Sequence, residues 1–286
     1  GCKTAAKNNL NTVLIDDKSF LGGTTLFQQN ECFKINSSYS NEWLKKEIET
    51  LNLFNNLTIK TRTTLAAYHS YNYLLARENL TDHLDLKDKK NKIRQRLWKI
   101  RAKKVIIATG AMERPLIFDN NDRPGIILSS SIKKYIDFYG VKCGQKISLF
   151  TNNDSAYETA ISLINHGVSV NSVVDIRDKT NSLIVKQVEK LGIKIHWKSS
   201  VINTNGYKKI NSIEIMKLSD DGTAAVGKKI KEECDCLGIS GGWTPRVHLF
   251  TQSGGKLKFR DEDNVFLPDK SELSQISIGS CNGDFE

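Results

Sequence analysis

The sequence lacks any long apolar run, and this absence excludes a membrane-spanning protein. Across 286 residues, no stretch approaches the roughly 18 consecutive apolar residues of a membrane helix. The first ten residues also lack the apolar core of a secretory signal peptide. Hydrophobic residues still make up 39% of the chain, which is enough for a sizeable core. We therefore expect one large or two medium globular domains, with no membrane partner.

Paired cysteines and suitably spaced histidines are missing as well. The six cysteines are scattered, and only Cys234 and Cys236 lie close together. One intervening residue fits neither a zinc site nor a C-x-x-C redox pair. The five histidines show no metal-binding spacing. This pattern predicts buried, reduced thiols in a cytoplasmic protein without a metal.

The chain carries a formal charge of +10 but no clean basic face. Its lysines are spread along the whole sequence, and the densest run, 87–92, lies beside Asp82, Asp85 and Asp88. A solvated loop accounts for such a mixed segment better than a nucleic-acid site does. We therefore expect no nucleic-acid partner.

The first nucleotide-type feature lies near the N-terminus. Residues 1–10 follow a helical pattern, and Thr12–Ile15 is a short apolar strand that ends in Asp16 and Asp17. This is the second half of a Rossmann βαβ unit, whose acid receives the ribose hydroxyls. The first half, a strand with a G-x-G-x-x-G turn, is absent, so we interpret the chain as a fragment. Gly22-Gly23 would suit either a dinucleotide or an ordinary loop.

A second feature is the stretch KKVIIATGAMERP at 103–115. It predicts a buried parallel strand, Val105 to Ala108, that runs directly into Thr109-Gly110. Ile276–Ile278 is a similar strand, and it runs into Gly279-Ser280. Glycine at such turns lets the backbone come close to a cofactor or to another chain segment.

A third feature is a complete βαβ unit at Ile147–Asp175. A buried strand leads through the turn TNNDS (151–155) into a helix over 156–165 and a strand over 172–175. Asn152 and Asn153 replace the expected glycines. They tolerate a positive φ, but their side chains hinder a pyrophosphate. A nucleotide site and a purely structural unit both remain open here.

Elsewhere the pattern predicts helices over 43–53, 129–139 and 182–191 and a hairpin-type pair over 208–218 and 227–233.

Three longer motifs carry a family resemblance. ATGAMERPLIFDNNDRPGI (108–126), LFTNNDSAYETA (149–160) and ISGGWTPRVHLFTQSGGKL (239–257) resemble the alpha subunits of four-subunit sarcosine oxidases. These belong to the flavoprotein reductases with two dinucleotide-binding domains. The resemblance implies an α/β fold in which an FAD/NAD(P)-binding Rossmann-like domain is interrupted by a second, smaller one. We place the first domain at 1–142 and 237–286 and the inserted domain at 143–236.

The resemblance also implies a function. Such oxidases are heterotetramers that demethylate sarcosine oxidatively to glycine and pass electrons through flavin to oxygen. The alpha subunit binds NAD, whereas FAD and FMN are held in the complex mainly through the beta subunit. The implied partners are this flavin-bearing beta subunit, small accessory subunits, the amine substrate, and folate at a C-terminal half that is missing here.

The family pattern transfers to several positions of this sequence. Asp16 is the expected ribose contact, with Asp17 as second choice, and the predicted groove is completed by Gly22, Gly23, Thr109, Gly110, Gly279 and Ser280. Ser280 replaces the aspartate that holds the FAD ribitol in flavin reductases, which favours NAD. Arg114 suits an anionic group or a salt bridge to Glu113 or Asp122. No catalytic or metal-binding residue is assigned.

Three rival functions make different demands on the sequence. A disulfide reductase needs a cysteine pair after Gly22-Gly23, where only Cys32 is near. A subunit of an opine or amino-acid dehydrogenase would carry a cysteine-rich iron–sulfur segment, which is not seen. A non-catalytic scaffold subunit remains open, because no acid–base constellation stands out. His248 is the best-placed polar candidate, and a structural hydrogen bond suits it better than catalysis.

Overall fold

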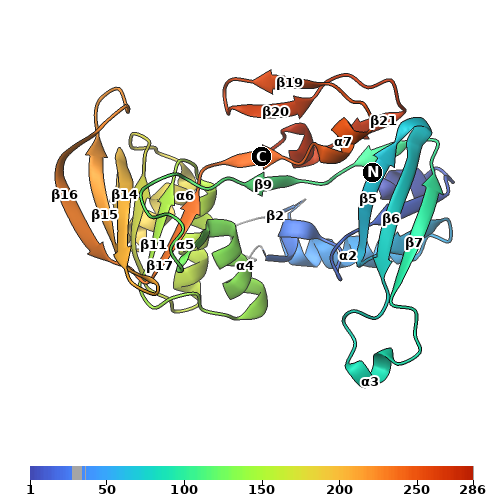
Figure 1. Cartoon of the computed structure of the whole chain (residues 1–286), viewed down its shortest axis with the longest axis horizontal. Helices are drawn as coiled ribbons and strands as arrows, with labels where there is room; N and C mark the ends of the chain where they lie inside the picture. Colours follow the sequence, from blue (N-terminus) through green and yellow to red (C-terminus); the bar gives the residue numbers. More distant parts are fainter. Residues whose placement is uncertain (28–33, 36, 286) are drawn as a thin grey trace. The chain divides into compact units, whose positions relative to one another are not determined.

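In the computed structural model, which describes residues 1–27, 34, 35 and 37–285, the chain divides into two compact units (Figure 1). Unit 1 comprises Gly1–Met112 and Thr244–Glu286, and unit 2 comprises Glu113–Trp243. The chain leaves unit 1 within strand β9 (Ala111–Glu113) and returns to it within strand β18 (Trp243–Pro245).

The boundaries of unit 2 differ from the predicted range 143–236. Strand β10 (Ile126–Leu128) pairs in parallel with β17 (Cys236–Ser240), so both belong to the unit 2 sheet. Helix α4 (Ser129–Tyr139) contributes Ile132 and Ile136 to the unit 2 core. The prediction missed these segments because their partners are distant in sequence.

Unit 2 contains one helix between most of its consecutive parallel strands, followed by an antiparallel sheet. The elements not yet given are β11 (Ile147–Thr151), α5 (Ser155–Asn165), β12 (Val170–Asp175), α6 (Leu183–Lys190), β13 (Lys194–His196), β14 (Ser199–Gly206), β15 (Ile210–Leu218) and β16 (Ala225–Glu233). The predicted helix over 129–139, the βαβ unit and the antiparallel pair over 208–233 are all present.

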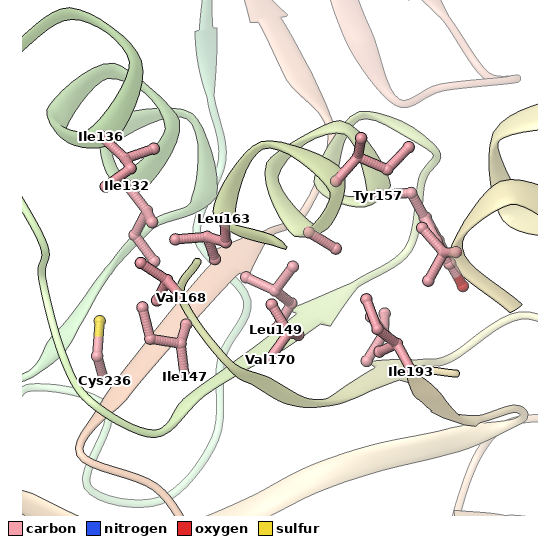
Figure 2. Close-up of a cluster of buried hydrophobic side chains, with 14 of the residues drawn as sticks. Ile132, Ile136, Ile147, Leu149, Tyr157, Leu163, Val168, Val170, Ile193 and Cys236 are labelled. Atoms are coloured by element: carbon pink, nitrogen blue, oxygen red, sulfur yellow. The ribbon is translucent and has the colours of Figure 1, made fainter. Parts of the chain in front are cut away.

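The parallel sheet of unit 2 has the order β10-β17-β11-β12-β13. Its central strands β11 and β17 are covered on both faces, and every residue in them is buried. One face packs against α4, α5 and α6 through residues such as Leu149, Leu163 and Ile193 (Figure 2). The other face packs against β14 and β15 through Phe150 and Ile213. Unit 2 is therefore a three-layer domain with a core on each side of the sheet.

Unit 1 is built from shorter elements. Its helices are α1 (Cys2–Lys7), α2 (Ser40–Asn52), α3 (Leu86–Lys89) and α7 (His248–Gln252), with 3-10 turns η1 (Gly23–Phe27), η2 (Ser70–Asn72) and η3 (Gly279–Asn282). Its remaining strands are β1 (Thr12–Ile15), β2 (Lys34–Ile35), β3 (Ser38–Tyr39), β4 (Leu57–Lys60), β5 (Thr63–His69), β6 (Tyr73–Asn79), β7 (Gln95–Arg101), β8 (Val105–Ile107), β19 (Leu257–Arg260), β20 (Val265–Pro268) and β21 (Gln275–Ser277).

The parallel strands of unit 1 form two separate pairs among the described residues, β1 with β4 and β8 with β21. The prediction that Val105 to Ala108 form a fully buried strand is wrong. Ile107 is buried, but Ile106 is 47% exposed, and so is Ile276 beside it at 58%. Side chains alternate along β8, so Ile106 points to the opposite face from the buried Ile107, and this face is less covered by the described residues. The strands β5, β6 and β7 form a three-stranded antiparallel sheet.

Two observations concern only the described part of the chain. Among those residues, no helix is long and apolar enough to cross a membrane, and no group of three or more metal-ligating side chains occurs. The cysteines there are free. Cys234, Cys236 and Cys281 are buried, while Cys2 and Cys143 are partly buried. Burial raises the pKa of Cys234 to about 11, so this thiol stays protonated. Cys32 lies outside the described residues.

Candidate functional site

Asp16 and Asp17 follow directly on strand β1. The backbone of Asp16 is fixed on both sides, since its N–H donates to Lys60 O (2.9 Å) and its C=O accepts from Thr63 N (2.9 Å). Its Oδ1 accepts from Lys18 N (2.9 Å), and a carboxylate retains further acceptor sites. Asp17 is exposed and pairs with Lys18 Nζ at 3.0 Å. Asp16 is therefore the better positioned of the two for a ribose.

The two glycines after this acid differ in their surroundings. A Cβ on Gly22 would lie 2.5 Å from Leu44 Cδ2, so Gly22 is required for close packing against helix α2. A Cβ on Gly23 would meet no atom within 4 Å, and its φ is +56°. Gly23 therefore presents open backbone, whereas Gly22 has a structural role.

The other predicted residues gather at the carboxyl ends of β8 and β21. These strands pair in parallel, with Ser277 opposite Ile107. Thr109 and Gly110 follow one strand, and Gly279 and Ser280 follow the other. The two turns therefore lie side by side.

Both of these turns have glycines in the left-handed region. Gly110 has φ +71° and Gly279 φ +65°, and a Cβ on either would meet no atom within 4 Å. Thr109 Oγ1 donates to Arg246 O (2.9 Å), which fixes the first turn. These open backbone faces fit a group that approaches closely. Ser280, which follows Gly279 in the second turn, is half-buried and carries no charge.

Unit 2 contains a polar cluster that the sequence analysis did not identify. The Glu113 carboxylate is 8% exposed and accepts from Ser130 N at the start of α4 (2.8 Å). Burial raises its pKa, against hydrogen bonds from Ser130 and Ser240 that lower it. Ser240 Oγ also accepts from Asn153 Nδ2 (3.0 Å), and Trp243 Nε1 donates to Ser155 Oγ (3.3 Å).

This cluster had only a weak sequence signal. Ser240 is followed by Gly-Gly-Trp immediately after a strand, and this pattern marks only the strand end. Glu113 and Trp243 are the first and last residues of unit 2. The hydrogen bonds of this cluster therefore connect both ends of the unit to residues in its interior.

A second buried network surrounds Asp175 at the end of β12. Asp175 is fully buried and accepts from Tyr157 OH (2.8 Å) and from Arg177 N, Nε and NH2. Burial raises the pKa of Tyr157, and the Asp175 carboxylate adds to this effect. Burial lowers the pKa of Arg177, but Asp175 and Asp154 outweigh it and raise that pKa. The acid of the second βαβ unit is therefore fully engaged inside the protein.

Two further polar residues from the sequence analysis have clear positions. The Arg114 guanidinium packs against Gly242, where a Cβ would lie 2.9 Å from NH2, and Arg114 N donates to Gly242 O (2.8 Å). His248 is exposed at the start of the short helix α7, where its C=O accepts from Thr251 Oγ1 (2.9 Å).

Comparison with known proteins agrees with this fold. Residues 62–276 match the family model of pyridine nucleotide-disulphide oxidoreductases. The thioredoxin reductase of T. acidophilum has a TM-score of 0.69 at 19% identity, over 100% of this chain and 88% of that one. The L-proline dehydrogenase of P. horikoshii has a TM-score of 0.67 at 22% identity, over 98% of this chain and 48% of that one. The predicted Rossmann-like α/β fold class is confirmed.

A closer relative comes from the sequence comparison. Sarcosine oxidase subunit alpha of Corynebacterium sp. (strain P-1) is 32% identical over 286 residues, which is 99% of this chain. The chain spans 29% of the length of that relative. The resemblance to sarcosine oxidase alpha subunits is confirmed, and the chain belongs to the pyridine nucleotide-disulphide oxidoreductase family.

Proposed function

We propose that the chain is the NAD-binding part of the alpha subunit of a multi-subunit sarcosine oxidase. The whole enzyme would demethylate sarcosine to glycine and pass electrons through FAD and FMN, held mainly by a beta subunit, to oxygen. Small accessory subunits and a folate-binding C-terminal half would complete the complex. The chain is an oxidoreductase component, and amine oxidation itself would take place on its partner.

The observation that carries this proposal is the set of open glycine turns in unit 1. Gly23, Gly110 and Gly279 all have a left-handed φ and free space at the Cβ position. Backbone of this kind can approach a dinucleotide without steric hindrance. Gly22 would support the groove from behind, through its packing against Leu44.

The polar residues of unit 1 would orient the dinucleotide. Asp16 would accept hydrogen bonds from the adenosine ribose hydroxyls, with Asp17 as the alternative. Thr109 and Ser280 would line the groove beside the two glycine turns. Ser280 carries no charge, which suits NAD better than an FAD held through its ribitol. Bound NAD would supply a nicotinamide able to accept hydride, or would serve as a structural element.

An Asp16→Ala substitution in the full-length, assembled complex tests this function. We expect NAD to bind about 10- to 100-fold more weakly, because charge-assisted hydrogen bonds to the ribose are lost. Sarcosine-dependent peroxide production should fall with it. Asp178→Ala, which removes an exposed carboxylate of unit 2, is the matched control and should change neither quantity.

Two other outcomes would have different consequences: the first would select the alternative ribose contact, and the second would contradict the proposed function. If NAD is lost from the Asp17→Ala variant and retained in Asp16→Ala, the residue that contacts the ribose is Asp17. Absence of turnover with any secondary amine, together with normal NAD content, would identify the chain as a scaffold subunit.

A further inference from the structure

In unit 2 strand β11 continues through α5 to the neighbouring parallel strand β12, while β17 lies on its other side. In dinucleotide-binding units of this βαβ form, the nucleotide binds beyond the carboxyl end of the first strand, with phosphates on the amides of the following helix. The family implies a pyridine nucleotide here, so the residues present must be tested for this fit.

Three backbone amides of the turn after β11 already donate hydrogen bonds within unit 2. Asn152 N donates to Ser240 O (3.2 Å), and Asn153 N donates to Thr151 Oγ1 (3.0 Å). Ser155 N, at the start of α5, donates to Asn153 Oδ1 (3.0 Å). A pyrophosphate would have to displace all three acceptors before it could bind to these amides.

The side chain of Asn153 occupies the space between this turn and β17. Its Nδ2 donates to Ser240 O (3.3 Å) and Ser240 Oγ (3.0 Å), and its Oδ1 accepts from Ser155 Oγ. Asn152 and Asn153 could tolerate a positive φ, but neither has one, so the turn does not adopt a glycine-like path. The Trp243 indole N–H donates to Ser155 Oγ, so the indole lies beside the start of helix α5.

The ribose end of such a site is closed as well. Asp175, the acid at the end of β12, is 0% exposed and is surrounded by Tyr157 and Arg177. Arg177 NH2 also donates to Asp154 Oδ1 (2.7 Å), which fixes the guanidinium over the carboxylate. Ribose hydroxyls cannot reach Asp175 without breaking this buried ion pair. The residues of unit 2 therefore do not fit a pyridine nucleotide.

We infer that unit 2 binds no pyridine nucleotide and that its βαβ turn is a structural element closed by its own side chains. The dinucleotide of this chain is then assigned to unit 1. That assignment rests on the proposed function, whereas the closure of unit 2 does not.

Hydrogen–deuterium exchange on the full-length alpha subunit in its complex tests the inference. The complex is measured with NAD, NADH or NADPH at saturating concentration and without nucleotide. We expect no added protection in peptides that cover 151–155 and 175–177. Saturable protection of these peptides by any of the three nucleotides would overturn the inference.

The same experiment separates this inference from the proposed function. Protection confined to peptides of unit 1 that cover 12–23, 105–110 and 275–283 supports both. If no peptide is protected in either unit, the NAD-binding function fails while the closure of unit 2 is supported.

An Asn153→Ala variant provides a second test that does not depend on NAD. If the side chain closes the turn, its loss should lower the Tm by about 2–4 °C, because several partly buried hydrogen bonds disappear. NAD affinity should stay unchanged. Asn8→Ala, which removes one exposed bond to Thr4 O, is the matched control for the amide loss. An unchanged Tm, or a change in NAD affinity with Asn153→Ala alone, would overturn the inference.

Discussion

Gly238 illustrates at the residue scale how one missing Cβ controls the packing of unit 2. A Cβ at this position would lie 2.6 Å from Leu149 Cδ2 and 2.7 Å from Ile132 Cδ1. Both neighbours are fully buried in a close-packed core. We expect Gly238→Ala to lower the free energy of unfolding by about 1–3 kcal/mol, measured by urea denaturation.

A double-mutant cycle checks the origin of this loss. In a Leu149→Ala background, Gly238→Ala should cost less, because one of the two clashing side chains has been shortened. An equal cost in both backgrounds would place the strain elsewhere.

The buried carboxyl group of Glu113 should make the free energy of unfolding depend on pH. Burial raises its pKa in the folded state, so folding favours the protonated form. Its contribution to stability is fully present below the unfolded-state pKa and is lost as the pH rises through the folded-state pKa. Glu113→Gln removes this titration and keeps an oxygen that can accept from Ser130 N.

The free energies of unfolding of the parent and of Glu113→Gln, compared between pH 4 and pH 8, test this effect. We expect the difference to shift in favour of the variant as the pH rises. A constant difference across the range would show that the carboxyl titrates normally.

Single residues also mark the limit of prediction from sequence. Asp16 and the glycines after β8 and β21 were recognisable, because each follows a strand in the local pattern. The role of Asn153 was not, since its partner Ser240 is 87 positions away in sequence. The exposure of Ile106 was missed for a related reason: an apolar run does not reveal whether other elements cover both faces of the strand.

At the scale of elements, Asp175 connects β12 to α5 through Tyr157 and Arg177. Asp175→Asn removes the charge that balances a largely buried guanidinium, so we expect a loss of about 3 kcal/mol in the free energy of unfolding. Asp17→Asn breaks only an exposed pair with Lys18 and should cost less than about 1 kcal/mol. Similar losses in both variants, in urea denaturation, would argue against a structural role for the buried network.

Most elements were predictable, because hydrophobic periodicity is a local property. The helices α4, α5 and α6 lie within one or two residues of their predicted ranges. The strand order was not predictable, because β17 inserts between β10 and β11 from a distant part of the chain. Because β10 and β17 both belong to the sheet of unit 2, the observed unit extends beyond the predicted range 143–236 on both sides.

For the whole molecule, the revised boundaries can be tested with fragments. Residues 113–243 contain all five parallel strands and both cores of unit 2. Residues 143–236 lack β10, α4 and nearly all of β17, which exposes the apolar partners of these elements. We expect the first fragment to unfold cooperatively on heating, followed by circular dichroism. If the shorter fragment unfolds as cooperatively as the longer one, the observed boundaries of unit 2 are wrong.

The most direct test of the account is the NAD content of the purified, full-length complex, since its central claim is that unit 1 holds the dinucleotide and unit 2 holds none. We expect NAD and alpha chain in equal amounts in the parent and in Asn153→Ala, and little NAD in Asp16→Ala. NAD in excess of chain, or NAD lost from Asn153→Ala but retained in Asp16→Ala, would contradict the account.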